Sequence, residues 1–160
     1  MKKILSICVL IGLLLTGCGG NMIVGKNIKP EDITDFYYTY ENINYNAYYQ
    51  RYRFYVEDGK HMFFHETRER KDDYGPCTED DTILKGNFGL SDEEWNTFIE
   101  LISDGMVTKR VDSAESGSRG PWTFIYWTKD RGKYQVFDFA DHQRRAEFEE
   151  FCVTLAERDK

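Results

Sequence analysis

The sequence lacks an excess of positive charge: 28 aspartates and glutamates outnumber 21 lysines and arginines, and the formal net charge is −7. Binding to nucleic-acid phosphates requires a basic surface or at least a basic stripe, so this composition argues against a nucleic-acid partner. The 160 residues provide room for one domain of ordinary size, which excludes a multidomain enzyme. A hydrophobic content of 41% also excludes a wholly disordered chain.

The sequence also lacks an apolar segment long enough to cross a membrane as a helix. The longest one covers residues 4–15 and contains Ser6 and Gly12, whereas a transmembrane helix needs about 20 apolar residues. Lys2 and Lys3 precede this segment. A short apolar segment after a basic start is typical of a signal peptide, so we expect the protein to be exported.

The tetrapeptide Leu15-Thr16-Gly17-Cys18 follows the apolar segment directly. A leucine three positions before a cysteine, with a small residue next to the cysteine, resembles the lipobox of bacterial lipoproteins. The resemblance implies cleavage after Gly17 and a diacylglycerol thioether on Cys18, which would hold the protein on the extracytoplasmic face of the cell membrane. The alternative is a plain signal peptide with an incidental cysteine.

These features divide the chain into a signal peptide (1–17), a lipidated cysteine with a tether (18–30) and one folded domain (31–160). Removal of the signal peptide leaves 19 basic residues against 28 acidic ones, a net charge of −9. The folded domain then contains only two thiols, those of Cys77 and Cys152. Two cysteines without close spacing do not predict a zinc site.

Two interpretations of Cys77 and Cys152 stay open. An even pair in an exported protein is typical of a disulfide, which here would close a loop of about 75 residues. In the chain-entropy model such a bond stabilises the fold by roughly 4 kcal/mol. The other interpretation is two unpaired thiols, with Cys152 as a small apolar residue on a helix face.

Alternating polar and apolar residues predict a set of β-strands in the folded domain. The Asp58-Gly59 pair between two of them is typical of a tight hairpin turn. The predicted strands cover residues 33–41, 45–56, 61–68, 121–128 and 133–139, with an irregular strand at 83–87.

Two helices are predicted from their caps and their apolar spacing. Ser91 and Glu94 form a capping box, and Gly105 is predicted to end that helix as a C-terminal cap. Asp141 is predicted to cap the second helix. Both helices have apolar residues at i, i+3, i+4 and i+7, namely Trp95, Phe98, Ile99 and Ile102 in the first and Phe148, Phe151, Cys152 and Leu155 in the second.

This order of elements predicts an α+β fold, with an antiparallel sheet of about five strands and two helices on one face. Each predicted hairpin precedes a helix, which raises the hypothesis of a duplicated hairpin-helix unit. The order resembles the hairpin-plus-helix modules of β-lactamase inhibitor protein, and the lipobox resembles that of small Gram-positive lipoproteins. Neither resemblance assigns a role to any residue of the folded domain.

Aromatic residues are concentrated in the first strands. Between Phe36 and Tyr55, ten of twenty positions are Phe or Tyr, including eight of the eleven tyrosines. Tyr49, Arg51, Arg53 and Tyr55 share one parity of a strand, so we expect them to form an outward-facing surface for an envelope protein or glycan. The alternative is that the guanidinium groups only pack on the rings across strands.

Recognisable catalytic motifs are missing. There is no Gly-x-Ser-x-Gly, phosphate loop, dinucleotide fingerprint or EF-hand spacing, and no cofactor is predicted. His61 and His65 would lie about 13 Å apart on a strand and cannot share a metal ion. We therefore predict a non-catalytic binding module. The alternative is a small envelope hydrolase, which needs two carboxyl groups about 5 to 9.5 Å apart.

Overall fold

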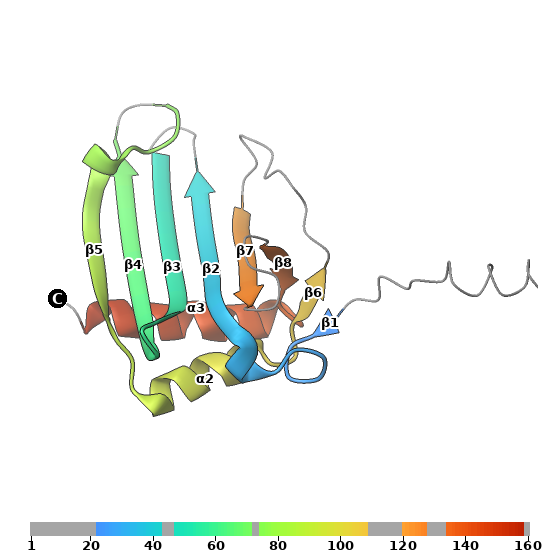
Figure 1. The fold of residues 1–160 in the computed structure, drawn as a ribbon. Helices are drawn as coiled ribbons and strands as arrows, with labels where there is room; N and C mark the ends of the chain where they lie inside the picture. The colour runs from blue at the N-terminus through green and yellow to red at the C-terminus, as the bar shows by residue number, and fades with distance from the viewer. Residues whose placement is uncertain (1–21, 43–46, 72–73, 109–119, 128–133, 159–160) are drawn as a thin grey trace, which may run out of the picture.

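The computed structural model describes residues 22–42, 47–71, 74–108, 120–127 and 134–158. These residues form an eight-stranded sheet, in which all strand pairs are antiparallel, and two α-helices. Both helices lie against the same face of the sheet (Figure 1). The structure therefore confirms the predicted α+β class and leaves the opposite face of the sheet, here called the open face, without a helix.

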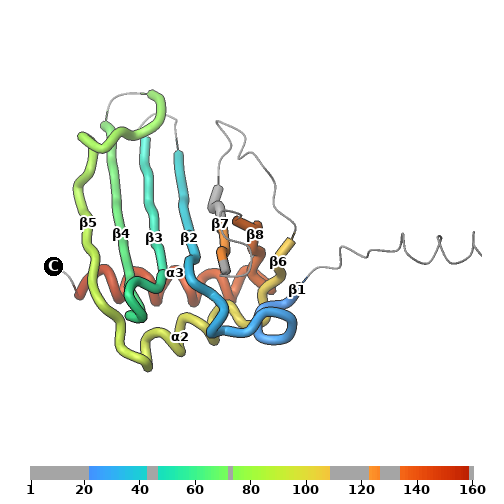
Figure 2. The backbone as a smooth tube through the Cα atoms, in the orientation of Figure 1, coloured from blue at the N-terminus to red at the C-terminus, as the bar shows by residue number. Residues whose placement is uncertain are grey.

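The strands fall into two groups along the chain. The first group is a meander of four long strands, β2 (Ile33–Asn42), β3 (Ala47–Glu57), β4 (Lys60–Arg70) and β5 (Thr82–Gly89). The second comprises β1 (Met22–Ile23), β6 (Met106–Thr108), β7 (Gly120–Trp127) and β8 (Gln135–Asp138). The order across the sheet is β1-β6-β8-β7-β2-β3-β4-β5, so β2 joins the two groups through its pairing with β7 (Figure 2).

The predicted number of about five strands is wrong, because the sheet has eight. The two unpredicted strands are β1 and β6, which are only two and three residues long and pair with each other. Segments this short carry no detectable alternation, so only long-range pairing makes them strands. The segment predicted as irregular at 83–87 is a full strand, β5, which pairs with β4 and has a register shift near Thr67.

The hairpin between β3 and β4 follows the predicted turn. Asp58 and Gly59 have φ angles of 50° and 75°, and Glu57 pairs with Lys60 on either side. Positive φ at both central residues is the requirement of the two-residue turn that matches the twist of an antiparallel pair. This turn sets the register of β3 against β4, and therefore decides which side chains of the two strands lie side by side on the open face.

The helices begin where their caps predict. In α2 (Asp92–Ile102) the Ser91 side chain accepts the Glu94 backbone N–H at 3.2 Å, and the Glu94 carboxylate accepts the Ser91 N–H at 2.7 Å. In α3 (His142–Glu157) the Asp141 carboxylate accepts the Arg144 N–H at 2.8 Å. The chain forms one further strand, β5, between the β3–β4 hairpin and α2, whereas α3 directly follows β7 and β8. The two predicted hairpin-helix units therefore differ by one strand.

The predicted role of Gly105 as a left-handed helix cap is wrong. The residue that caps the C-terminus of α2 is Ser103, and Gly105 is not among the glycines with positive φ. Gly105 is instead buried where the chain enters β6, and a Cβ atom at this position would overlap the ring of Phe137. Its small size, rather than its conformational freedom, is what this position requires.

Aromatic rings fill the space between the sheet and the helices. Phe36 in β2 contacts Phe98 of α2 and Phe148 of α3, with ring centroids 5.4 and 5.6 Å apart. Phe54 in β3 stacks on Phe98 with a centroid separation of 4.1 Å. All four rings are fully buried. Four of the ten aromatic residues between Phe36 and Tyr55 therefore belong to the core, on the parity opposite to that of the predicted binding surface: Phe36, Tyr38, Tyr52 and Phe54.

Candidate binding surface on the open face

A set of tyrosines and arginines covers the open face of β2, β3 and β4. Strand alternation turns these side chains away from the helices, and the register pairs Tyr37 with Arg53 and Tyr49 with Arg68 across neighbouring strands. We call the set the arginine–tyrosine ladder; it consists of Tyr37, Tyr49, Arg51, Arg53, Tyr55 and Arg68.

Each tyrosine ring of the ladder carries one or two guanidinium groups over its face. The guanidinium carbon of Arg53 lies 4.9 Å from the ring centroid of Tyr37 and 4.4 Å from that of Tyr55. Arg51 lies 5.6 Å from Tyr37 and 5.4 Å from Tyr49, and Arg68 lies 4.9 Å from Tyr49. Such contacts contribute about 0.5 to 1 kcal/mol each at exposed sites and more where water is excluded.

The first arginine of the ladder, Arg53, is fixed by a carboxylate. Its Nε and Nη2 donate to Oδ1 and Oδ2 of Asp35 at 2.9 and 2.6 Å, a bidentate arrangement. The hydrogen bond to Asp35 raises the pKa of Arg53 above its ordinary value. The Asp35 side chain is only 9% exposed, so loss of Arg53 would leave a poorly solvated carboxylate.

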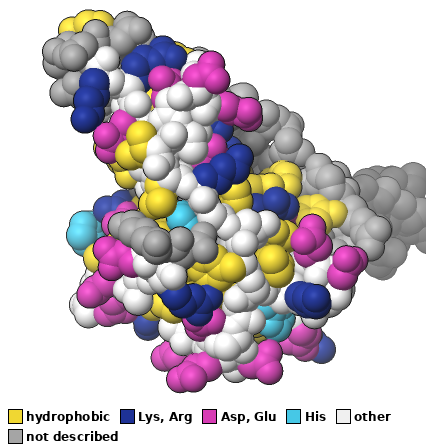
Figure 3. All heavy atoms as spheres, turned by 90° about the vertical axis from the view of Figure 1, so that its left-hand side faces the viewer, with side chains coloured by type: hydrophobic (Ala, Val, Ile, Leu, Met, Phe, Trp, Pro, Cys, Tyr) yellow, Lys and Arg dark blue, Asp and Glu magenta, His cyan; other side chains and the backbone are white. Residues whose placement is uncertain are grey.

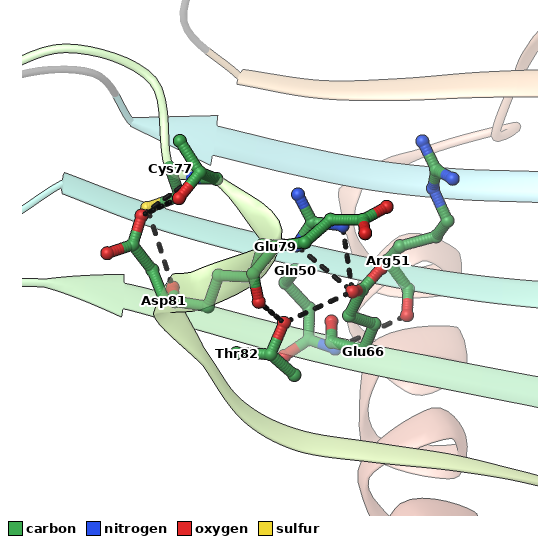
Figure 4. A network of polar contacts seen from close by, with 9 residues as sticks. Gln50, Arg51, Glu66, Cys77, Glu79, Asp81 and Thr82 are labelled. Carbon is green, nitrogen blue, oxygen red and sulfur yellow. Dashed lines mark hydrogen bonds and ion pairs between the residues drawn. The ribbon is translucent and has the colours of Figure 1, made fainter.

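The second, Arg68, is fixed by the buried carboxylate of Glu66. Nε and Nη2 of Arg68 donate to one oxygen of Glu66 at 3.0 and 2.8 Å, and the Thr82 hydroxyl donates to the same oxygen at 3.4 Å. Figure 4 shows this carboxylate within the polar network that joins β4 to the segment before β5. Arg70, which lies near this network but is not part of the ladder, forms an ion pair with Asp81: its Nη2 lies 3.0 Å from Oδ2 of Asp81.

The third arginine of the ladder, Arg51, has no carboxylate partner among the described residues. Its Nε is buried and finds no hydrogen-bond acceptor within that part of the chain. Its cross-strand neighbour Glu66 is already engaged by Arg68, and in Figure 4 the guanidinium of Arg51 points away from Glu66. The ladder therefore contains one guanidinium, near the rings of Tyr37 and Tyr49, that no carboxylate of the described residues engages.

The structure corrects one member of the predicted surface. Tyr49, Arg51 and Arg53 are half-buried on the open face, but Tyr55 is only 8% exposed. Arg53 covers its ring, and its hydroxyl hydrogen-bonds to Asn87 of β5 at 3.1 Å. Tyr55 is thus a packing residue, and guanidinium groups of the ladder do lie over tyrosine rings of neighbouring strands.

Residues of the neighbouring strands complete the surface, and the sequence analysis missed them. Tyr37 and Asp35 come from β2, and Glu66 and Arg68 come from β4. Strand alternation gave a usable signal, because Asp35 and Tyr37 have the parity opposite to the core residue Phe36. What it could not supply was the register that sets them beside particular residues of β3.

Of the two interpretations left open by the sequence, the structure has the unpaired one: Cys77 and Cys152 are both free thiols. Cys152 is fully buried in α3, within the core on the helix side of the sheet. Cys77 is half-buried beside β4, and its Sγ lies 3.8 Å from the Arg68 carbonyl oxygen. The two sulfurs thus occupy separate environments, in agreement with the interpretation of Cys152 as an apolar residue on a helix face.

We expect both thiols to react only slowly or after unfolding. Burial raises the pKa of the Cys152 thiol well above its ordinary value, and burial together with the charge of Asp81 raises that of Cys77. Because the thiolate is the nucleophile, iodoacetamide at neutral pH should label Cys77 slowly in the native chain and Cys152 only in denaturant. Peptide mapping without reductant measures the labelling of both cysteines. A disulfide-linked peptide that joins them would contradict their assignment as free thiols.

The histidines of β4 are packing residues. His61 stacks on Trp95 with ring centroids 4.2 Å apart, and His65 is fully buried between Phe63 and Phe88 at 5.9 and 6.4 Å. Within the described ranges, no group of three or more His, Cys, Asp or Glu side chains could hold a metal ion. The chemistry of this region is therefore that of ring packing.

A cleft of about 490 Å³ lies where β8 meets the start of α3. Its lining includes two carboxylates, Asp138 and Asp141, which are the nearest candidates for a hydrolytic pair outside the open face. Both residues are exposed, and the Asp141 carboxylate is engaged in capping α3. The cleft therefore does not provide the buried carboxyl group that a general acid requires.

The two carboxylates of the open face are also poorly placed for hydrolysis. Asp35 and Glu66 lie on β2 and β4, and their partners on β3, Tyr55 and Arg51, are four residues apart. Strand geometry then separates the carboxylates by about 16 Å, beyond the 9.5 Å upper limit for an inverting pair. Each is also engaged by an arginine, so neither is available to protonate a substrate.

The lipobox with Cys18, the signal peptide and residues 18–21 of the predicted tether lie outside the described residues. The predicted boundary of the folded domain at residue 31 is wrong, because residues 22–30 already belong to the fold: Met22 and Ile23 form β1, and Val24 and Ile28 are buried in the core. None of the helices formed by the described residues is long and apolar enough to span a membrane. No protein-family model matches the chain, and neither a curated protein nor a solved structure matches it significantly.

Proposed function

We propose that this protein is a bacterial lipoprotein whose folded domain is a non-catalytic binding module on the extracytoplasmic face of the cell membrane. The anchor rests on the basic start, the short apolar segment and the Leu15-Thr16-Gly17-Cys18 motif. With a net charge of −9 after processing, the domain gains no general attraction to anionic lipids, so the lipid on Cys18 supplies the membrane affinity.

The observation that carries the binding role is the arginine–tyrosine ladder on a sheet face that neither helix covers. Tyrosine and arginine dominate the energetics of protein interfaces, because each buries a large area and keeps a polar end for specific contacts. In this protein they are concentrated on one face and held in place by stacking and by Asp35 and Glu66. A rigid side-chain arrangement lowers the entropy lost on binding.

The charge distribution supports the open face as the side that meets a partner. The two helices on the other side contain eight acidic and two basic residues in all. Figure 3, which views the molecule from the β5 side, shows acidic side chains gathered at its lower end, where α2 lies. The helix side is thus strongly acidic, whereas the ladder contributes three arginines to the open face.

Photo-cross-linking in the bacterial membrane tests this function. We expect p-benzoylphenylalanine in place of Tyr49 to give a discrete cross-linked product, because position 49 lies beside Arg51 on the open face. The same group in place of Val153, an exposed residue of α3, is the matched control and should give none. Cross-linking from position 153 alone would transfer the binding role to the helix side and contradict the proposal.

A further inference from the structure

We propose, resting on the binding function above, that the open face recognises an acidic polypeptide segment of a partner protein. The Asp or Glu carboxylate of that segment would pair with the guanidinium of Arg51. Among the arginines of this face, Arg53 is engaged by Asp35, Arg68 by Glu66 and Arg70 by Asp81. Arg51 alone has no carboxylate among the described residues.

The surroundings of Arg51 hold its guanidinium ready for a carboxylate. The ring centroids of Tyr37 and Tyr49 lie 5.6 and 5.4 Å from the guanidinium carbon of Arg51. These two rings restrict the planar group before a ligand binds. The planar fork of an arginine matches a carboxylate through two parallel N–H···O bonds. The neighbouring carboxylate of Glu66 is engaged by Arg68, whose Nε and Nη2 both donate to its Oε1 at 3.0 and 2.8 Å.

The same contacts disfavour a glycan as the ligand. Sugars bind to aromatic side chains mainly by stacking on a free ring face. In the ladder each of these rings already contacts two guanidinium groups, Arg51 and Arg53 at Tyr37 and Arg51 and Arg68 at Tyr49, which compete with a sugar for the ring faces. What remains for a ligand is the N–H edge of a guanidinium and the edges of the rings, which suits a carboxylate beside apolar side chains.

The charge asymmetry of the domain directs an acidic segment to this face. The two helices together contain eight carboxylates and two arginines, so their side of the domain repels an acidic ligand on balance. Lys85, which pairs with Glu66 in the register and lies 5.8 Å from the ring of Phe64, adds a second cation on the open face. Orientation of the partner therefore follows from electrostatics as well as from Arg51, which no carboxylate of the described residues engages.

Calorimetric titration of the full chain, purified in a neutral detergent, with poly-L-glutamate at low salt tests the inference. Arg51→Gln is expected to weaken binding about tenfold or more, because it removes a charge-assisted hydrogen-bond pair. Lys85→Gln, the matched control, removes an equal charge from the same face and should weaken binding by less than about threefold. Thermal unfolding of both variants should match the wild type, which separates loss of binding from loss of fold.

Titration with polygalacturonate, a polysaccharide with one carboxylate per residue, distinguishes the two ligand classes. Weaker binding of polygalacturonate than of poly-L-glutamate supports the inference. Tighter, Arg51-dependent binding of the polysaccharide would overturn the polypeptide assignment while leaving the open face as the binding surface. Binding of poly-L-glutamate that Arg51→Gln leaves unchanged, or no binding at all, would overturn the inference. Cross-linking from position 49 judges the binding function independently.

Discussion

Replacing Cys18 by alanine is expected to release the protein from the membrane fraction and to abolish its labelling with palmitate. The thioether to a diacylglycerol can form only on this side chain, and two acyl chains are what hold a lipoprotein stably on a bilayer. Each buried methylene group contributes about 0.8 kcal/mol, so loss of both chains removes nearly all of the membrane affinity. Labelling with radioactive palmitate, followed by fractionation and immunoblotting, measures both effects.

Cys8→Ala is the matched control, because Cys8 lies within the segment that cleavage would remove. This variant should keep both the label and the membrane location of the wild type. Palmitate labelling that persists in Cys18→Ala would show that another residue carries the lipid, and the lipoprotein assignment would then be wrong.

The second large effect is expected from Gly105→Ala, which should lower the free energy of unfolding by about 3 kcal/mol. The added methyl group would overlap the ring of Phe137 and lie 3.0 Å from the Asp138 carbonyl oxygen. Phe137 is fully buried and contacts Phe36 and Phe139 at 5.2 and 4.9 Å, so a shift of its ring disturbs the core. Denaturant unfolding followed by circular dichroism gives the change.

Gly89→Ala provides the comparison for this effect. Gly89 ends β5, and a Cβ atom there would meet nothing closer than the His61 carbonyl oxygen at 4.0 Å. Its unfolding free energy should stay within about 0.5 kcal/mol of the wild type. Equal stability of the Gly105 and Gly89 variants would mean that Phe137 does not pack against residue 105.

Much of the fold could be predicted because its strongest elements carry local signals. The Asp58-Gly59 turn, the Ser91 capping box and the Asp141 cap all appear in the structure as predicted. Each depends on residues within four positions of one another, so the sequence contains the whole interaction. The strands β1 and β6 had no such signal, because each becomes a strand only through pairing with distant segments.

The candidate site was predictable in part for the same reason. Alternation along β3 correctly separated Phe54, which is buried against the helices, from Arg51 and Arg53 on the open face. It could not show that Asn87 and Arg53 would cover Tyr55, or that Asp35 and Glu66 would engage two of three arginines. Those contacts join residues of different strands, and a single strand contains no information about its neighbours' register.

By itself, the sequence determined the class of fold, the N-terminal caps of both helices, the β3–β4 turn and the parity of the ladder, because all of these follow from local spacing. Only the tertiary structure decided which arginine lacks a carboxylate, why residue 105 must be glycine and why Cys152 is an isolated thiol in the core. These features depend on distances between segments far apart in the chain. Strand register and helix packing set those distances, and no local pattern encodes them.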